Sequence, residues 1–211
     1  MRRTPDLIEA LVADAAPVHR LRPPMLRAGL WLLVAAAVIG ILSLIFGIRP
    51  DCAQRLREPM FLMGIAAPIL TGTLAALAAF MASLPDRSRL WLALPAPAAA
   101  LWLCTIGYGC ISDWVAIGPG SIQAGEAVRC FCTLLATGLP LTGILFWMLR
   151  HAAALRPRGV TFVASLSVAA FTASALTLMH QLDASLEILL WNLGAAAVVL
   201  GIDHAVARRV L

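Results

Sequence analysis

The sequence predicts an all-α fold: a polytopic membrane bundle of six transmembrane helices, preceded by a short N-terminal cytoplasmic amphipathic helix. Three observations support this fold class. Hydrophobic residues make up 61% of the 211 residues and charged residues only 13%, whereas soluble domains carry about 25% charged residues. Six long apolar stretches follow one another along the chain. The 16 basic residues, all of them Arg, are divided unequally between the two ends of these stretches.

The N-terminal 25 residues are polar and precede the first apolar stretch. A secretory signal peptide would instead place a short apolar segment directly after a few basic residues. We therefore expect residues 1–25 to form a cytoplasmic head and tether, and residues 26–211 to form the six-helix transmembrane domain.

Residues 4–15 predict the amphipathic helix of this head, with Thr4 as a cap and Pro5 at the first helical position. Its apolar face consists of Leu7, Ile8, Leu11 and Val12, and its acidic face of Asp6, Glu9 and Asp14. A helix that lies on an anionic membrane has a basic polar face. The acidic face therefore favours a protein partner with a hydrophobic groove and a basic rim; the alternative is a helix packed against the bundle. The basic segment 19–24 ends in two prolines and cannot continue the helix.

The six predicted spans each reach or approach the ~20 residues that cross a bilayer. They cover residues 28–48, 60–84, 90–112, 131–149, 160–182 and 187–206. Their composition does not alternate between polar and apolar residues, which argues against a β-barrel. Prolines inside the second, third and fourth spans predict kinks there, and these are Pro68, Pro95, Pro97 and Pro140.

The arginines predict the orientation of the bundle. Twelve fall on one side of the predicted spans and four on the other, and the side richer in Arg is normally cytoplasmic. Both termini are then cytoplasmic, and the connections 49–59, 113–129 and 183–186 face the opposite side. Because the connections are short, we expect helices adjacent in sequence to pack antiparallel. Topology accounts for the basic balance, so the sequence predicts no direct contact with nucleic acid.

The middle of the predicted spans carries almost no ionisable groups. Asp113 and His180 lie near outer ends, and Asp203 and His204 near an inner end, where interfacial anchoring explains them. No metalloprotease pattern, phosphate loop or nucleophile elbow occurs, so we expect neither an enzyme nor a bound cofactor. A small membrane transporter or channel remains an alternative, although its path would have to be lined mostly by Ser, Thr and Gly. A haem or quinone protein using His180 would lack a second axial ligand at matching depth.

Four of the five cysteines gather at the predicted outer edge of the membrane. They are Cys52, Cys110, Cys130 and Cys132, whereas Cys104 lies deeper. Cysteine also occurs in membrane spans as a small apolar packing residue. The functional interpretation is a redox- or metal-responsive thiol site, since exposed thiolates react. The one-residue spacing between Cys130 and Cys132 is a weak metal signature, and a bound metal stays an open question.

Residues 2–24, RRTPDLIEALVADAAPVHRLRPP, resemble the N-terminal signature of the NrsF-type negative regulators of sigma factor F. Further agreement lies in the Arg-Cys at 129–130, the Leu-Pro at 139–140, the Leu-Arg at 149–150, and the segment 178–191. The resemblance implies a multi-pass protein of the bacterial inner membrane that holds an extracytoplasmic-function sigma factor. Release would follow oxidative or heavy-metal stress, sensed by outer-face cysteines.

The resemblance assigns the contact with the sigma factor to the head: Asp6, Leu7, Ile8, Leu11, Arg20 and Arg22. An acidic helix can cover the basic surface with which a sigma factor binds DNA. The resemblance also makes Cys130 or Cys132 one sensing thiol. The second family cysteine directly follows a His, and here Gln181 occupies that position. Sensing then either uses a neighbour such as Cys110 or is altered. We expect the first, with the outer ends of the third and fourth helices, which carry Cys110, Cys130 and Cys132, close enough for a disulfide.

Overall fold

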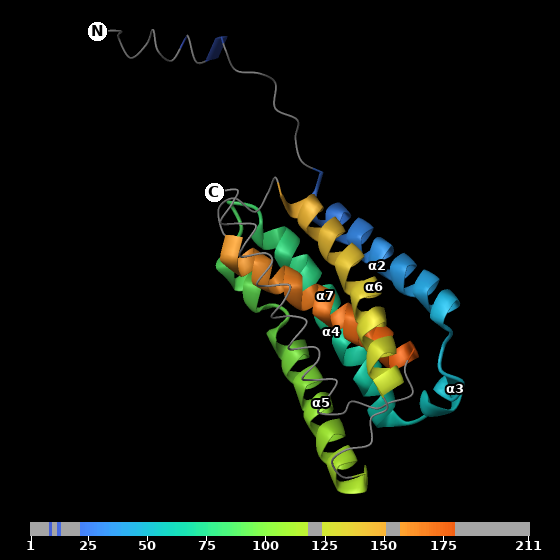
Figure 1. The fold of residues 1–211 in the computed structure, drawn as a ribbon. Helices are drawn as coiled ribbons and strands as arrows, with labels where there is room; N and C mark the ends of the chain where they lie inside the picture. The colour runs from blue at the N-terminus through green and yellow to red at the C-terminus, as the bar shows by residue number, and fades with distance from the viewer. Residues whose placement is uncertain (1–8, 10–11, 14–21, 118–123, 151–156, 180–211) are drawn as a thin grey trace.

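The computed structural model describes residues 9, 12–13, 22–117, 124–150 and 157–179 (Figure 1), with the helix path alone for 109–117, 124–130 and 157. The helices are α2 (Pro24–Phe46), α3 (Cys52–Arg55), α4 (Pro59–Ala82), the 3-10 helix η1 (Arg89–Ala93), α5 (Ala96–Ile117), α6 (Ala124–Leu149) and α7 (Pro157–Met179). The described ranges contain no strand, which confirms the all-α prediction.

Five helical segments are long and apolar enough to cross a membrane. They are Pro24–Phe46, Pro59–Ala82, Arg89–Tyr108, Phe131–Leu149 and Arg158–Met179, with mean hydropathies from 1.6 to 2.6. These correspond to the first five predicted spans. The sixth, at 187–206, lies outside the described residues. Of the predicted head helix, Glu9, Val12 and Ala13 are described, and all three are helical and exposed.

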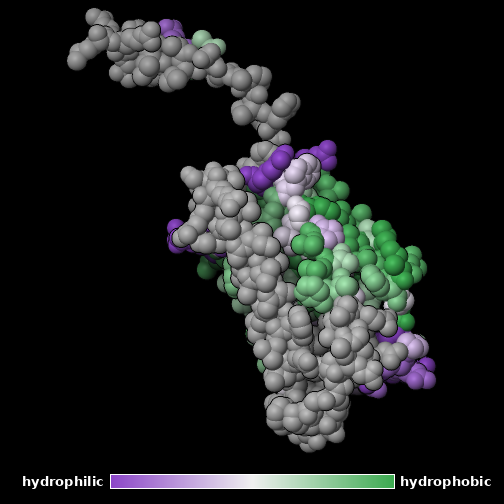
Figure 2. All heavy atoms as spheres, in the orientation of Figure 1, coloured by the Kyte–Doolittle hydropathy of each residue, from purple (hydrophilic) through white to green (hydrophobic). Residues whose placement is uncertain are grey.

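The long helices alternate in direction, as the short connections predict (Figure 1). We call the end where α2 begins the Arg27 end, and the end where it finishes the Arg49 end. Helices α2, α4 and α7 meet along the middle of the bundle, where contacts between α4 and α7 are the most extensive. Figure 2 shows an apolar band on the visible face, with hydrophilic residues gathered at its two ends. The bundle therefore has the surface polarity of a membrane-spanning protein.

Helices α4 and α7 form the core of the described bundle. In their apolar segments 67% and 61% of the residues are buried, against 11% for α2 and 28% for α6. Gly72 permits this approach, because a Cβ atom there would lie 2.8 Å from the ring of Phe171. Across the same contact, the Ser167 hydroxyl donates to the Gly72 carbonyl at 2.6 Å. Close packing at a small residue, with a hydrogen bond between helices, is typical of association in lipid.

The third predicted span, 90–112, is present, and a proline interrupts its helix, as the kink predicted there suggests. It consists of η1 followed by α5, and the break falls at Pro95, because proline has no N–H to continue the helical hydrogen bonding. Pro97 lies in the first turn of α5, where a missing N–H costs nothing. Pro68 and Pro140 lie inside α4 and α6, as predicted.

The predicted loop 113–129 is also wrong in its bounds, since α5 continues to Ile117 and α6 begins at Ala124. The charged residues in this stretch mark the end of the apolar segment, but backbone hydrogen bonding continues through them. In the connection 49–59, the short helix α3 covers Cys52–Arg55.

Candidate functional site: the Arg49 end and the junction of α2 with α6

The described thiols are free, and they differ in exposure. Cys52 is partly exposed at the start of α3, whereas Cys104 on α5 and Cys132 on α6 are exposed. Cys110 and Cys130 lie on α5 and α6 in stretches where the helix path alone is described. Among the described side chains, no three His, Cys, Asp or Glu residues converge on a common point.

The neighbours of α5 and α6 bear on the predicted thiol pairing. Helix α5 packs on α4, whereas α6 packs on α2 and α7. Over the described residues, α5 and α6 are therefore not principal neighbours, contrary to the expectation that consecutive helices pair throughout. The outer ends that carry Cys110 and Cys130 fall in the stretches without described side chains, so their pairing stays a prediction.

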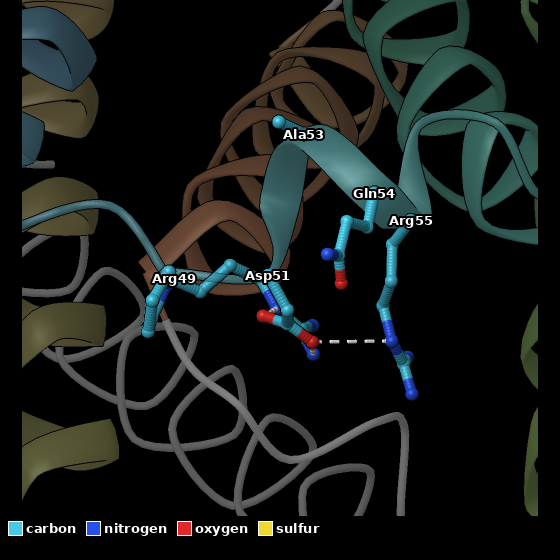
Figure 3. Close-up of a pocket in the computed structure, with 6 residues that line it drawn as sticks. Arg49, Asp51, Ala53, Gln54 and Arg55 are labelled. Carbon is cyan, nitrogen blue, oxygen red and sulfur yellow. Dashed lines mark hydrogen bonds and ion pairs between the residues drawn. The ribbon is translucent and has the colours of Figure 1, made fainter.

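At the Arg49 end, the loop between α2 and α4 is organised by one carboxylate. The Arg49 guanidinium donates to both carboxylate oxygens of Asp51, at 2.7 Å and 2.9 Å (Figure 3). Arg55 approaches the same carboxylate at 3.3 Å, one helical turn further along the chain. Such bidentate pairing is the strong form of an Arg–carboxylate contact. Hydrogen bonding from Arg49 lowers the pKa of Asp51 below its ordinary value.

Arg49 is also fixed to the rest of the bundle. Its side chain is 2% exposed, and its guanidinium lies 5.3 Å from the centre of the Phe61 ring on α4, within range of a cation–π contact. Its backbone N–H donates at 3.1 Å to the carbonyl of Leu178, one of the last carbonyls of α7, which have no partner inside that helix. The loop that carries Cys52 is therefore attached to both α4 and α7.

This loop borders a shallow cavity of about 640 Å³, lined by Arg49, Pro50, Asp51, Ala53, Gln54 and Arg55 (Figure 3). From the sequence, Arg49 and Arg55 were interpreted only as charges that set the topology, and their clustering with Asp51 was not predicted. The signal that could have revealed it is the spacing of the three charges, because an Asp four residues before an Arg is a favourable pair on one helical turn.

A second buried arginine lies at the Arg27 end, and unlike Arg49 it lies inside a span. Arg27, in the first turn of α2, is 7% exposed. Its guanidinium donates to the carbonyl of Met148 near the end of α6 and lies 5.1 Å from the centre of the Phe80 ring on α4. One turn further along α2, the Trp31 indole N–H donates to the carbonyl of Leu141 at 3.5 Å. From the sequence, Arg27 was interpreted only as a topology charge, although an ionisable group within a span indicates a functional residue by default.

Helix α6 differs on the two sides of Pro140. Towards the Arg27 end, Leu141, Leu145 and Leu149 are 0%, 0% and 1% exposed. Towards the Arg49 end, the described buried residues are Thr133 and Thr137. The half that carries the cysteines is therefore held by less apolar packing than the half that contacts α2.

Of the residues predicted to contact a partner, the structure describes Arg22, which is exposed just before α2. Asp6, Leu7, Ile8, Leu11 and Arg20 lie outside the described residues.

Comparison with known protein families matches residues 11–211 to NrsF, described as the negative regulator of sigma F. The match covers far more than half of the chain and confirms the resemblance seen in its sequence. It begins at Leu11, so most of the predicted head helix precedes it. No curated protein and no solved structure matches the chain.

Proposed function

Because the chain belongs to the NrsF family of negative regulators of sigma F, we propose that it is a membrane-embedded anti-sigma factor. It sequesters an extracytoplasmic-function sigma factor at the bacterial inner membrane and releases it under oxidative or heavy-metal stress. The regulatory role is inferred from the family match. The five apolar helices support anchoring in a membrane, from which a bound sigma factor cannot reach its promoters.

The charges at the two ends support a cytoplasmic Arg27 end. Among the described residues this end carries six arginines and one acidic residue, namely Arg22, Arg27, Arg87, Arg89, Arg150, Arg158 and Asp86. The Arg49 end carries four arginines and four acidic residues: Arg49, Arg55, Arg57, Arg129, Asp51, Glu58, Asp113 and Glu126. The excess of Arg at the end where the head joins the bundle is the pattern of a cytoplasmic side. The head then lies in the compartment that contains sigma factors.

The head makes the contact with the sigma factor through Leu7, Ile8 and Leu11, flanked by Asp6 and by Arg20 and Arg22. The helical, exposed residues Glu9, Val12 and Ala13 support this assignment. A helix of about twelve residues has only marginal stability in water, so it orders fully on binding. Part of the interaction energy then offsets the conformational entropy that is lost on ordering. The resulting moderate affinity suits a reversible regulator.

Sensing takes place at the Arg49 end, through Cys130 or Cys132 with Cys110 in place of the family cysteine that Gln181 replaces. The exposure of Cys132 supports this, because a thiol must be accessible to react. Oxidation joins two thiols in one disulfide, and the oxidant takes up two electrons and two protons. The head releases its partner only if the two resulting packings bind it with different free energies.

Co-purification from membranes tests the proposed function. The full chain and a variant lacking residues 1–24 are extracted with the sigma factor co-expressed, and the retained protein is identified. We expect retention by the full chain and its loss in the truncated variant, with equal amounts of both in the membrane. Equal retention by both would show that the head does not make the contact, and no retention by either would contradict the anti-sigma function.

A further inference from the structure

The helix that carries the head is attached to the bundle mainly through its first half. The buried residues of α2 are Arg27, Ala28, Trp31 and Ala35. Near the other end, Ile41, Leu44 and Ile45 are 57%, 87% and 69% exposed. The head directly precedes α2 in the sequence, so the first turns of α2 are the part of the bundle closest to the head along the chain.

Both side-chain hydrogen bonds from this half of α2 end on the same helix. Arg27 donates to Met148 and Trp31 to Leu141, and the order of the two contacts is that of antiparallel helices. The two acceptors are separated by two turns of α6. Two attachment points along the axis fix the direction of α2 relative to α6 as well as its distance, which a single point would not do.

Leu141, whose carbonyl accepts from Trp31, directly follows Pro140 in α6. Proline removes one N–H from the helical ladder and favours a bend there. The cysteine-bearing half of α6 can therefore tilt against the buried half, and the tilt is felt first at Leu141, where the Trp31 contact is already long at 3.5 Å. The Trp31 ring also packs edge-on against Phe171 of α7, with centroids 5.5 Å apart.

Arg27 suits its position in three ways that no other side chain combines. It donates to a carbonyl in the last turn of α6, which has no partner within that helix. Its positive charge is favourable at a helix C-terminus. Its guanidinium lies over the ring of Phe80 on α4, within range of a cation–π contact, so one side chain joins α2, α4 and α6.

We propose that Arg27, assisted by Trp31, is the positioning residue that couples the sensing half of α6 to the head. The inference rests on the proposed function: a tilt at Pro140 moves α2 through these two contacts, and the movement releases the sigma factor. Without them the head still binds, but it no longer responds to the thiols.

Four variants test this coupling: Arg27→Gln and Trp31→Phe, each with a matched control. Arg89→Gln removes an exposed arginine from the same end, and Trp147→Phe removes an indole N–H from an exposed tryptophan of α6. Transcription dependent on the sigma factor is measured before and after the thiol oxidant diamide. We expect unchanged basal transcription and an induction about five- to tenfold smaller in Arg27→Gln, an intermediate loss in Trp31→Phe, and full induction in both controls.

A measurement without the sigma factor separates the coupling from the proposed function. Spin labels are attached to cysteines introduced by Leu33→Cys and Trp147→Cys, in a full-length chain whose native cysteines are replaced by alanine, and the distance between the two labels is measured. The Arg27→Gln change should broaden the distance distribution between α2 and α6, and Arg89→Gln should leave it sharp. An unbroadened distribution overturns the inference, as does full induction in Arg27→Gln. A broadened distribution, in a chain that retains no sigma factor at all, contradicts the proposed function and with it the role in release.

Discussion

Replacing Gly72 by Ala places a methyl group at the contact between α4 and α7. The added Cβ would lie 2.8 Å from two ring atoms of Phe171, whereas carbon atoms in contact prefer about 3.5–4.0 Å. The ring would have to withdraw by roughly 0.7 Å or more. It cannot do so freely, because Phe171 is 7% exposed and packs against Trp31. Overpacking of this kind costs about 1–3 kcal/mol.

Gly64 provides the matched control in the same helix, since nothing lies within 4 Å of a Cβ atom there. Both substitutions gain the higher helix propensity of Ala, about 1 kcal/mol. The difference between them therefore isolates the contact. We expect the Gly72→Ala protein to be about 1–3 kcal/mol less stable than the Gly64→Ala protein in thermal unfolding in detergent. Replacing the Phe171 ring with a smaller side chain, by adding Phe171→Leu to the Gly72→Ala protein, should recover part of the lost stability. Equal stability of the two alanine variants would refute the close approach of α4 and α7.

Four other positions in the chain give further expectations. The buried Thr172 hydroxyl has no hydrogen-bond partner among the described residues, so Thr172→Val should stabilise the protein by about 1 kcal/mol in thermal unfolding, whereas Thr172→Ser should not. The lowered pKa of Asp51 contributes stability above its ordinary value of 3.8, which is lost as the pH falls through the folded pKa; acidification should therefore lower the melting temperature more in the native protein than in Asp51→Asn. Substituting Leu7 and Leu11 by Asp should abolish sigma-factor retention without affecting membrane insertion; unchanged retention would exclude the apolar face of the head as the contact. Exposed Cys132 should react with a membrane-impermeant alkylating reagent in intact cells and be protected after oxidant, and equal reactivity in both states would make it a packing residue.

Hydropathy and charge were sufficient to predict five spans, their alternating direction and the sorting of arginines between two ends, because each depends on local composition. They could not predict which helices touch. A long apolar segment shows no strong periodicity when lipid and protein are both apolar, so the central position of α4 and α7 is set by complementary shapes such as Gly72 against Phe171. For the same reason Arg27 and Arg49 could be assigned to ends of spans, while their acceptors, at Met148 and Asp51, depend on neighbours that the pattern does not reveal.

The pairing of α4 with α7 also constrains how the bundle is assembled during synthesis. The hydrogen bond from Ser167 to Gly72 joins residues 95 positions apart, and ribosomes add about 5–20 residues each second. Helix α4 therefore spends about 5 to 20 seconds in the bilayer before its principal partner is made. Lipid tails must cover its small-residue face during that interval, which its mean hydropathy of 1.9 makes tolerable. The arrival of α7 displaces those lipids, so the central contact of the bundle is among the last to form.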